Sequence, residues 1–319
     1  MTPTEPQEGA ATKVSVVVPL YNEEENVEEL HARIVSALDR SGHPYEILFV
    51  DDGSRDGTVR ILRDIAARDR RVRVIKLRRN YGQTPSMRAG IDAATGDVIV
   101  TMDGDLQNDP EDIASLVEHL GRGYDLVAGW RRNRQDALIS RKVPSKIANW
   151  LIGKVVAVPI RDNGCSLKAY RASVIKQTPL YSEMHRFIPA MVTAGGGRIA
   201  EVPVRHHPRL RGTSKYGISR TGKVLLDMIT VKMLVAFSQR PLHWFGLLAV
   251  PPAVLSVFAV AVHVLMIVDP RVAAEAVLPS VAALFAYLSI HMIMLGFLGE
   301  LIVRTGRSRP FRSVTRLGP

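Results

Sequence analysis

The sequence predicts an α/β domain with a mostly parallel sheet, followed by a juxtamembrane amphipathic helix and a hairpin of two transmembrane helices. Over the first part of the chain, short β-branched runs alternate with helical patterns, which is typical of right-handed βαβ units. A polar cluster follows each of the first four runs. Near the end of the chain, residues 242–268 and 276–299 contain no Lys, Arg, Asp or Glu. Each stretch reaches the roughly 20 residues that cross a membrane.

The composition restricts the kind of partner. The chain has 42 Lys and Arg against 31 Asp and Glu, a net charge of +11, which suits nucleic acid, anionic lipid or phosphorylated substrates. A single cysteine, Cys165, excludes an internal disulfide framework and fits a reducing compartment or its membrane face. Residues 1–12 lack the basic and apolar regions of a signal peptide, so we expect them to be a disordered N-terminus.

The α/β domain is expected over residues 13–216. Its first helix is expected to begin at Asn22, with Glu25 as its capping-box partner, and a later helix at Asp109-Pro110. The carboxyl ends of parallel strands share one edge of a sheet, where ligands gather. We therefore expect the polar clusters to converge at that edge. The expected strands are residues 14–19, 46–50, 72–77 and 97–102.

An acidic motif follows the fourth expected strand. Asp103 and Asp105 stand one residue apart, and alternate side chains of an extended chain point the same way. Two such carboxylates can face one hard cation, Mg²⁺ or Mn²⁺, which would neutralise a departing diphosphate. For the acids that come next, a solvated turn at a helix N-terminus is the interpretation we favour; these are Asp109, Glu111 and Asp112.

Several motifs together resemble the family-2 glycosyltransferases with a GT-A fold, over about residues 13–303. They are VVVPLYNEEENV, VDDGSRDGT, RNYGQ, MDGDLQNDPEDI, DNGCSLKAYR, RFIP, GTSKY and GFLGELI. Within the family, the chain is similar to the polyprenyl-phosphate glycosyltransferases, and most of all to those that transfer 4-deoxy-4-formamido-L-arabinose to undecaprenyl phosphate. Three positions depart from that pattern: Gly104 replaces Ala, Asn163 replaces Tyr and Thr213 replaces Glu. The last two of these bear on the sugar and the acceptor.

The resemblance implies inverting transfer of a sugar from a UDP-sugar to undecaprenyl or another polyprenyl phosphate, with Mn²⁺ or Mg²⁺ as cofactor. The metal would be held by Asp105, with Asp103 and Gln107. The nucleotide would contact Pro19, Tyr21, Glu23, Asp52, Asn80, Asp103 and Gln107. The residues implied in catalysis are Asp162, Asp105 and Arg131.

For several of these residues, a structural role is the alternative. Asp162 matches the position of a general base, but an ionised phosphate acceptor hardly needs one, so Asp162 would orient the sugar or a neighbouring arginine. Asp51, and as an alternative Asp52, would form an Asx turn. Tyr21 could serve packing alone. Cys165 is not expected to be a nucleophile, because the chemistry needs no covalent intermediate.

A basic loop at residues 131–146 suits a phosphate arriving on a lipid. Arginine grips phosphate bidentately, and the loop has no aromatic residue for base stacking, which argues against nucleic acid. A solvated basic face is the alternative. Adjacent His206 and His207 are interpreted as structural or basic-patch residues rather than metal ligands. The resemblance places the acceptor phosphate at Arg131, Arg141, Ser145, Arg211, Ser214 and Lys215.

The rest of the chain is expected at the membrane. Residues 217–241 fit an amphipathic helix in the headgroup plane, with a core helix as the alternative. Residues 242–268 and 276–303 would span the bilayer, unless they are buried helices of a soluble fold. The basic tail, residues 304–319, predicts that both termini and the catalytic domain face the cytoplasm of a bacterial inner membrane. Relatives imply a homo-oligomer, with a tetramer as one form.

Other functions remain open at this point. The expected product is a polyprenyl-phosphate sugar that serves as a donor for envelope glycan or lipid A modification. As alternatives, the transferred sugar could be glucose or another hexose, and the acceptor could be of the dolichyl type. A processive polysaccharide synthase would need a QxxRW motif, which is absent from the sequence. A non-catalytic membrane-anchored scaffold that binds nucleotide-sugar is an alternative of another class. A nucleic-acid-binding protein is disfavoured, because part of the positive charge flanks the apolar stretches.

Overall fold

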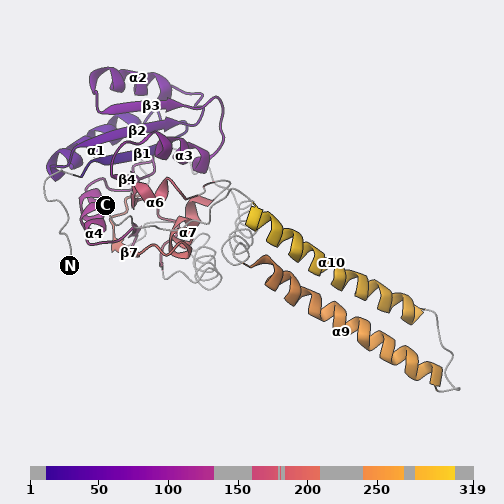
Figure 1. The fold of residues 1–319 in the computed structure, drawn as a ribbon. Helices are drawn as coiled ribbons and strands as arrows, with labels where there is room; N and C mark the ends of the chain where they lie inside the picture. The colour runs from indigo at the N-terminus through magenta and orange to yellow at the C-terminus, as the bar shows by residue number, and fades with distance from the viewer. Residues whose placement is uncertain are drawn as a thin grey trace, which may run out of the picture. The chain divides into compact units, whose positions relative to one another are not determined.

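The computed structural model describes residues 12–132, 160–178, 180, 184–208, 240–268 and 277–305. The chain divides into two compact units, which are drawn together in Figure 1. The first unit comprises Met1–Val231 with Phe311–Pro319, and the second Lys232–Pro310. Most of the predicted amphipathic helix lies outside the described residues, and so do nearly all of the predicted N-terminal segment and basic tail.

The first unit is built on a seven-stranded sheet with the order β3-β2-β1-β4-β6-β5-β7. The first four strands are parallel to one another, β6 runs antiparallel to β4 and β5, and β7 is parallel to β5. The four predicted strands and the mostly parallel sheet are confirmed. The strands are β1 Val14–Leu20, β2 Tyr45–Asp51, β3 Val72–Lys76, β4 Val98–Thr101, β5 Leu126–Trp130, β6 Lys168–Arg171 and β7 Ile199–Pro203.

Helices connect the strands and cover the sheet. The apolar residues of α1 lie on one face, because Val27, Leu30, Ile34 and Leu38 recur at helical spacing and are all buried in the core. The helices of this unit are α1 Val27–Ser41, α2 Thr58–Arg68, α3 Gln83–Ala93, α4 Asp112–Gly121, the short α6 Ala172–Ile175 and α7 Ile188–Ala194, which follows the 3₁₀ helix η1 Met184–Phe187.

The predicted start of the first helix is wrong. Asn22 has a φ of +51°, which is not helical, and its Oδ1 accepts the N–H of Arg55 at 2.8 Å. The helix begins instead after Asn26. The Asn22 side chain, which the sequence pattern predicted as a helix cap, therefore accepts a hydrogen bond from a loop 33 residues away instead. The later helix also begins slightly after the predicted position, at Asp112, behind a turn in which its N–H bonds to Asp109 O.

The second unit is an antiparallel pair of helices, α9 Pro241–Val268 and α10 Val277–Thr305 (Figure 1). Ser256 Oγ donates to Ala282 O at 2.8 Å, and Ser289 Oγ to Ala249 O at 3.0 Å. Both helices are long and apolar enough to cross a membrane, and only 22% and 17% of their most apolar windows is buried. So little burial disfavours the alternative of core helices in a soluble fold.

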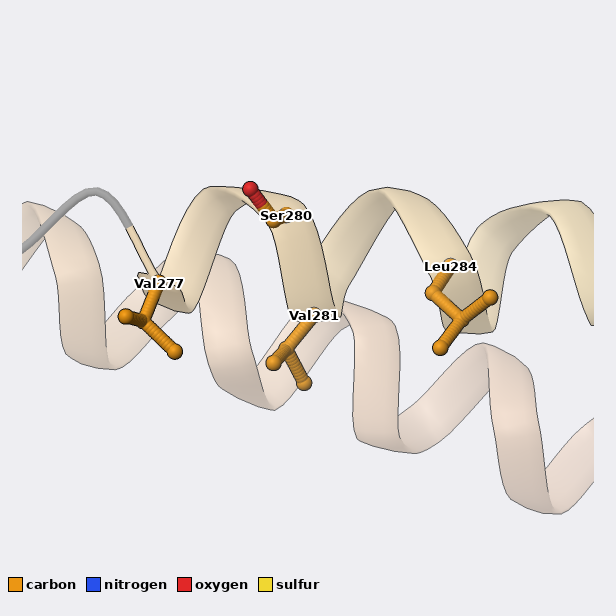
Figure 2. Close-up of a pocket in the computed structure, with 4 residues that line it drawn as sticks. All are labelled: Val277, Ser280, Val281 and Leu284. Carbon is orange, nitrogen blue, oxygen red and sulfur yellow. The ribbon is translucent and has the colours of Figure 1, made fainter.

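One hollow on this unit is apolar. Figure 2 shows Val277, Ser280, Val281 and Leu284 of α10 lining it. Three of the four side chains are aliphatic, and the fourth is a neutral hydroxyl. The residues that line the hollow therefore offer no charged or metal-ligating group for catalysis.

Candidate active site

The polar segments after β2 and β3 meet at one edge of the sheet. The Asp52 carboxylate accepts the N–H of Tyr81 and the N–H of Gly82, both at 2.8 Å. Gly53, the residue after Asp52, has a φ of +73°, and a Cβ there would lie 2.6 Å from the carbonyl carbon of Arg79. Only glycine allows this close approach without strain. The expected convergence of these two clusters is confirmed.

Asp51 has a purely local role. Its carboxylate accepts the N–H of Gly53 at 3.2 Å and that of Ser54 at 3.2 Å, which is an Asx turn. The structural interpretation of Asp51 is therefore confirmed. The same turn also holds the loop after β1, because Asn22 N donates to Ser54 Oγ at 2.9 Å. Three strand ends thus form one connected framework.

The residues predicted to contact the nucleotide surround this framework. Pro19, near the end of β1, and Tyr21 and Glu23, just after it, are partly buried, and Asn80 is exposed. Glu23 also supports the loop, since its Oε2 accepts Asn26 Nδ2 at 2.7 Å. Tyr81 was not predicted. Its side chain is 48% exposed, and the guanidinium of Arg79 lies over its ring, 4.9 Å from the ring centroid.

The acidic motif lies beyond the end of β4. Gln83 Nε2 at the start of α3 donates to Asp103 Oδ1 at 2.7 Å, and Asp105 Oδ1 accepts the N–H of Gln107 at 3.2 Å. Burial and the neighbouring Asp105 carboxylate raise the pKa of Asp103, against a hydrogen bond from Ser166 that lowers it. The Asp105 carboxylate is therefore close enough to disfavour ionisation of Asp103.

The backbone of this motif is constrained. Leu106 is buried and has a φ of +60°, a conformation that is unusual for a bulky residue and recurs at functional sites. A Cβ at Gly104 would overlap the side chain of Leu20. Glycine at the position where the family has alanine is thus matched to close packing between the motif and β1.

The motif suits a shared metal ion rather than a metal site made of protein ligands alone. Across the described residues, no group of three or more His, Cys, Asp and Glu side chains could hold a metal. Two mutually repelling carboxylates still fit a hard divalent cation, which would relieve the repulsion and take further oxygen ligands from a diphosphate. Gln107, the third predicted ligand, has its Nε2 3.5 Å from His207 O.

A second charged pair lies beside the acidic motif. Arg131 Nε and Nη2 donate to Asp162 Oδ2 and Oδ1 at 2.7 and 2.9 Å. Burial would lower the pKa of Arg131, but the Asp162 carboxylate raises it, so the guanidinium stays charged. Arg131 in turn lowers the pKa of Asp103. This fork is the arrangement expected of a carboxylate that orients an arginine.

Two residues that were not predicted, the buried Lys168 and the partly buried Glu201, hold the turn that carries Asp162. Lys168 is 3% exposed, burial lowers its pKa, and its Nζ donates to Cys165 O and, at 3.4 Å, to Asn163 O. Glu201 Oε1 accepts the backbone N–H of Arg161 at 2.7 Å and that of Asp162 at 3.1 Å. Lys168 is the first residue of β6 and lies within the DNGCSLKAYR motif, which was the available signal for it.

Other predicted residues have the structural roles that we favoured. His207 Nε2 lies 3.1 Å from Asp109 Oδ2, Arg205 pairs with Asp112, and Glu111 pairs with Arg40. Cys165 is fully buried, and burial raises the pKa of its thiol to about 11, so it stays protonated and unsuited to nucleophilic attack. Five predicted acceptor residues lie outside the described residues: Arg141, Ser145, Arg211, Ser214 and Lys215.

A mostly parallel sheet with acidic and basic clusters beyond its strand ends is the arrangement in which α/β folds bind ligands. Two solved structures of glucosyl-3-phosphoglycerate synthase from Mycobacterium tuberculosis share this fold. One, in complex with phosphoglyceric acid, has a TM-score of 0.54 and 21% identity over 70% of this chain and 80% of its own. The other, with Mn²⁺, uridine diphosphate and phosphoglyceric acid, has a TM-score of 0.51 and 21% identity over 70% and 78%.

Sequence comparison establishes the family. Residues 15–179 match the family described as Glycosyl transferase family 2. The dodecaprenyl-phosphate galacturonate synthase of Rhizobium johnstonii is 45% identical over 92% of this chain and 88% of its own. The undecaprenyl-phosphate 4-deoxy-4-formamido-L-arabinose transferase of Edwardsiella ictaluri is 39% identical over 91% and 89%. The chain belongs to glycosyl transferase family 2, among its polyprenyl-phosphate sugar transferases, and its α/β unit is a GT-A-like domain.

Proposed function

We propose that the protein transfers a sugar from a UDP-sugar to a polyprenyl phosphate with inversion at the anomeric carbon. The observation that carries the proposal is the proximity of two charged pairs on one edge of the sheet. The Asp103 and Asp105 carboxylates suit a cation bound to a diphosphate, and the Arg131–Asp162 fork suits a second anion. A reaction between a nucleotide diphosphate donor and a phosphate acceptor needs both.

The nucleotide end would be held by Pro19, Tyr21, Glu23, Asp52 and Asn80, with Asp103 and Gln107 beside the diphosphate. Asp52 already accepts two backbone N–H groups, and a carboxylate can accept more than two hydrogen bonds. A uracil N–H is a suitable further donor. The framework of strand-end turns would then position UDP without rearrangement.

The catalytic residues would act by positioning and charge. A bound Mn²⁺ or Mg²⁺ would stabilise the negative charge that develops on the departing UDP, and Asp103, Asp105 and Gln107 would hold it. The acceptor phosphate is already ionised, so no strong general base is required. Asp162 would keep Arg131 in place. Arg131 in turn would use its remaining N–H groups to align the phosphate oxygen opposite the leaving group.

The most similar named relatives indicate the donor and the acceptor. One is named for galacturonate and dodecaprenyl phosphate at 45% identity, and others for 4-deoxy-4-formamido-L-arabinose and undecaprenyl phosphate at 37–39%. We propose UDP-galacturonate as the donor because of the higher identity. Transfer of 4-deoxy-4-formamido-L-arabinose, the sugar indicated by the sequence motifs, is the second candidate. Either product would supply envelope glycan or lipid A modification.

The membrane arrangement follows from the apolar helices and the basic flanks. α9 and α10 would span a bacterial inner membrane. The catalytic unit and both termini would lie in the cytoplasm, because Arg240 precedes α9, and Arg304 near the end of α10 is followed by four further arginines. The acceptor phosphate would arrive at the membrane surface, near Arg141, Ser145, Arg211, Ser214 and Lys215. Self-association of the chain, including a tetramer, is part of this proposal.

Purified full-length protein tests the proposal. It is incubated with Mn²⁺, undecaprenyl phosphate and, in turn, UDP-galacturonate, UDP-4-deoxy-4-formamido-L-arabinose, UDP-glucose and UDP-galactose, and the lipid product is identified by mass spectrometry. We expect a polyprenyl-phosphate sugar that disappears when the metal is chelated. UDP binding without any lipid product would instead support the non-catalytic scaffold. Product formation unchanged by chelation would contradict the metal assignment.

A further inference from the structure

The turn that carries Asp162 is fixed from two sides. Glu201 accepts the backbone N–H groups of Arg161 and Asp162, and Lys168 donates to the carbonyl oxygens of Asn163 and Cys165. All four of these contacts are to the main chain, so they hold the path of residues 161–165 and leave the side chains of the turn for other partners. A turn held this firmly is typical of preorganised binding sites.

One side chain of this turn has an unused donor. Asn163 is 4% exposed, and its Nδ2 is buried without a hydrogen-bond partner among the residues that the structure describes. Buried amide groups are nearly always hydrogen-bonded in folded proteins. An N–H group left without an acceptor next to the Arg131–Asp162 fork therefore points to an acceptor that a ligand supplies.

The charge around the turn indicates which acceptor. Arg131 and Lys168 lie beside it, and Arg161 within it packs its guanidinium 4.5 Å from the centroid of Trp130. Asp162 pairs with Arg131, Glu201 accepts the backbone N–H of Arg161, and Asp103 also lies near Arg131. The guanidinium groups of Arg131 and Arg161 favour an anionic group on the ligand, and a carboxylate accepts hydrogen bonds more strongly than a hydroxyl.

We propose that Asn163 Nδ2 donates a hydrogen bond to the carboxylate of a uronic acid donor sugar and thereby selects it over the neutral hexose. The assignment rests on the proposed function, since it places the transferred sugar beside the Arg131–Asp162 fork. Asn163 is a specificity-determining residue in this account. Glu201 and Lys168 are positioning residues that hold its turn.

Binding of two donors that differ only at C6 tests the assignment. Titration calorimetry with Mn²⁺ would measure the affinity of full-length protein for UDP-galacturonate, UDP-galactose and UDP. We expect the wild type to prefer UDP-galacturonate. Asn163→Ala and Asn163→Ser should reduce that preference about tenfold or more, with UDP affinity unchanged. Asn163→Asp should weaken UDP-galacturonate binding further, because it adds a like charge.

A matched control separates recognition from distortion of the turn. Glu201→Ala removes the acceptor of two backbone N–H groups without altering the Asn163 amide, so it should weaken both sugar nucleotides alike. Equal affinity of the wild type for the two donors would overturn the assignment, and so would Asn163 variants that weaken both donors equally or neither. The readout needs no lipid acceptor, so failure to transfer sugar would overturn the proposed function and leave this result standing.

Discussion

Two carboxylates at opposite ends of the same sheet, the buried Glu46 and the partly buried Asp103, have opposite environments. Glu46, near the start of β2, accepts hydrogen bonds from Ser15 Oγ at 2.7 Å, Thr95 N at 2.6 Å, Thr95 Oγ1 at 2.7 Å and Arg73 Nη1 at 3.1 Å. Burial alone would raise the pKa of Glu46, but these hydrogen bonds lower it to about 2. Asp103, beyond the end of β4, has a raised pKa because of burial and the adjacent Asp105.

The difference separates a carboxylate that stabilises the fold from one that awaits a ligand. Every donor that Glu46 needs is supplied by the protein, so its charge is fully compensated at the amino end of the sheet. At the carboxyl end, Asp103 and Asp105 repel each other, and an external cation would relieve that repulsion. The two ends can therefore be perturbed independently.

The largest expected effect is on catalysis at the carboxyl end. Asp105→Asn removes a carboxylate that would hold the metal ion, so transfer should fall by about a thousandfold or more. The folded state should be retained, because the substitution also removes one of two mutually repelling charges. Sugar transfer and the thermal unfolding midpoint measure the two quantities. Asp112→Asn, at the start of α4, alters contacts to Arg205 in the segment after β7, so it is the control and should keep transfer. Equal loss in both variants would contradict the distinction.

The next effect concerns the framework that joins β2 and β3. Gly53→Ala places a Cβ 2.6 Å from the Arg79 carbonyl carbon at a φ of +73°, so it should displace the Tyr81–Gly82 segment from Asp52. We expect UDP affinity to fall more than tenfold and stability by about 1–3 kcal/mol. Gly42→Ala has a similar φ of +70° with no atom within 4 Å, and it should cost about 1 kcal/mol without weakening UDP binding.

The amino end of the sheet should respond to pH rather than to ligand. The folded-state pKa of Glu46 is lowered to about 2, so its stabilisation is present above the ordinary value near 4.5 and is lost as pH falls toward 2. Glu46→Gln should reduce stability at pH 7 by about 2 kcal/mol and flatten the decline between pH 4.5 and 2. Unfolding midpoints across that range check this, and a parallel decline in both proteins would refute it.

The smallest effect sharpens the account of the acidic motif. Gly104→Ala restores the residue typical of the family but overlaps Leu20, so we expect a loss of about 1–2 kcal/mol in stability. Combining it with Leu20→Val, which shortens the opposing side chain, should recover part of that loss. Additive destabilisation by the two substitutions would show that the overlap is not the cause.

The strands and the residues at their carboxyl ends were predictable because each is a local pattern. β-branched runs and the acids directly after them identified Asp52, Asp103 and Asp105 without the structure. Contacts between distant segments were not predictable in this way. The start of α1 depends on a hydrogen bond that the Arg55 N–H donates to Asn22, and the clamp on the Asp162 turn depends on Glu201, 39 residues away from it. The antiparallel insertion of β6 between β4 and β5 likewise has no local signature.

Metal binding tests the central claim most directly. Electron paramagnetic resonance of Mn²⁺ titrated into the full-length protein with UDP would report whether Asp103 and Asp105 hold a cation shared with the diphosphate. We predict one tightly bound Mn²⁺ that requires UDP and disappears in the variant carrying both Asp103→Asn and Asp105→Asn. Undiminished Mn²⁺ binding in that double variant, or sugar transfer that persists after complete chelation, would contradict the account.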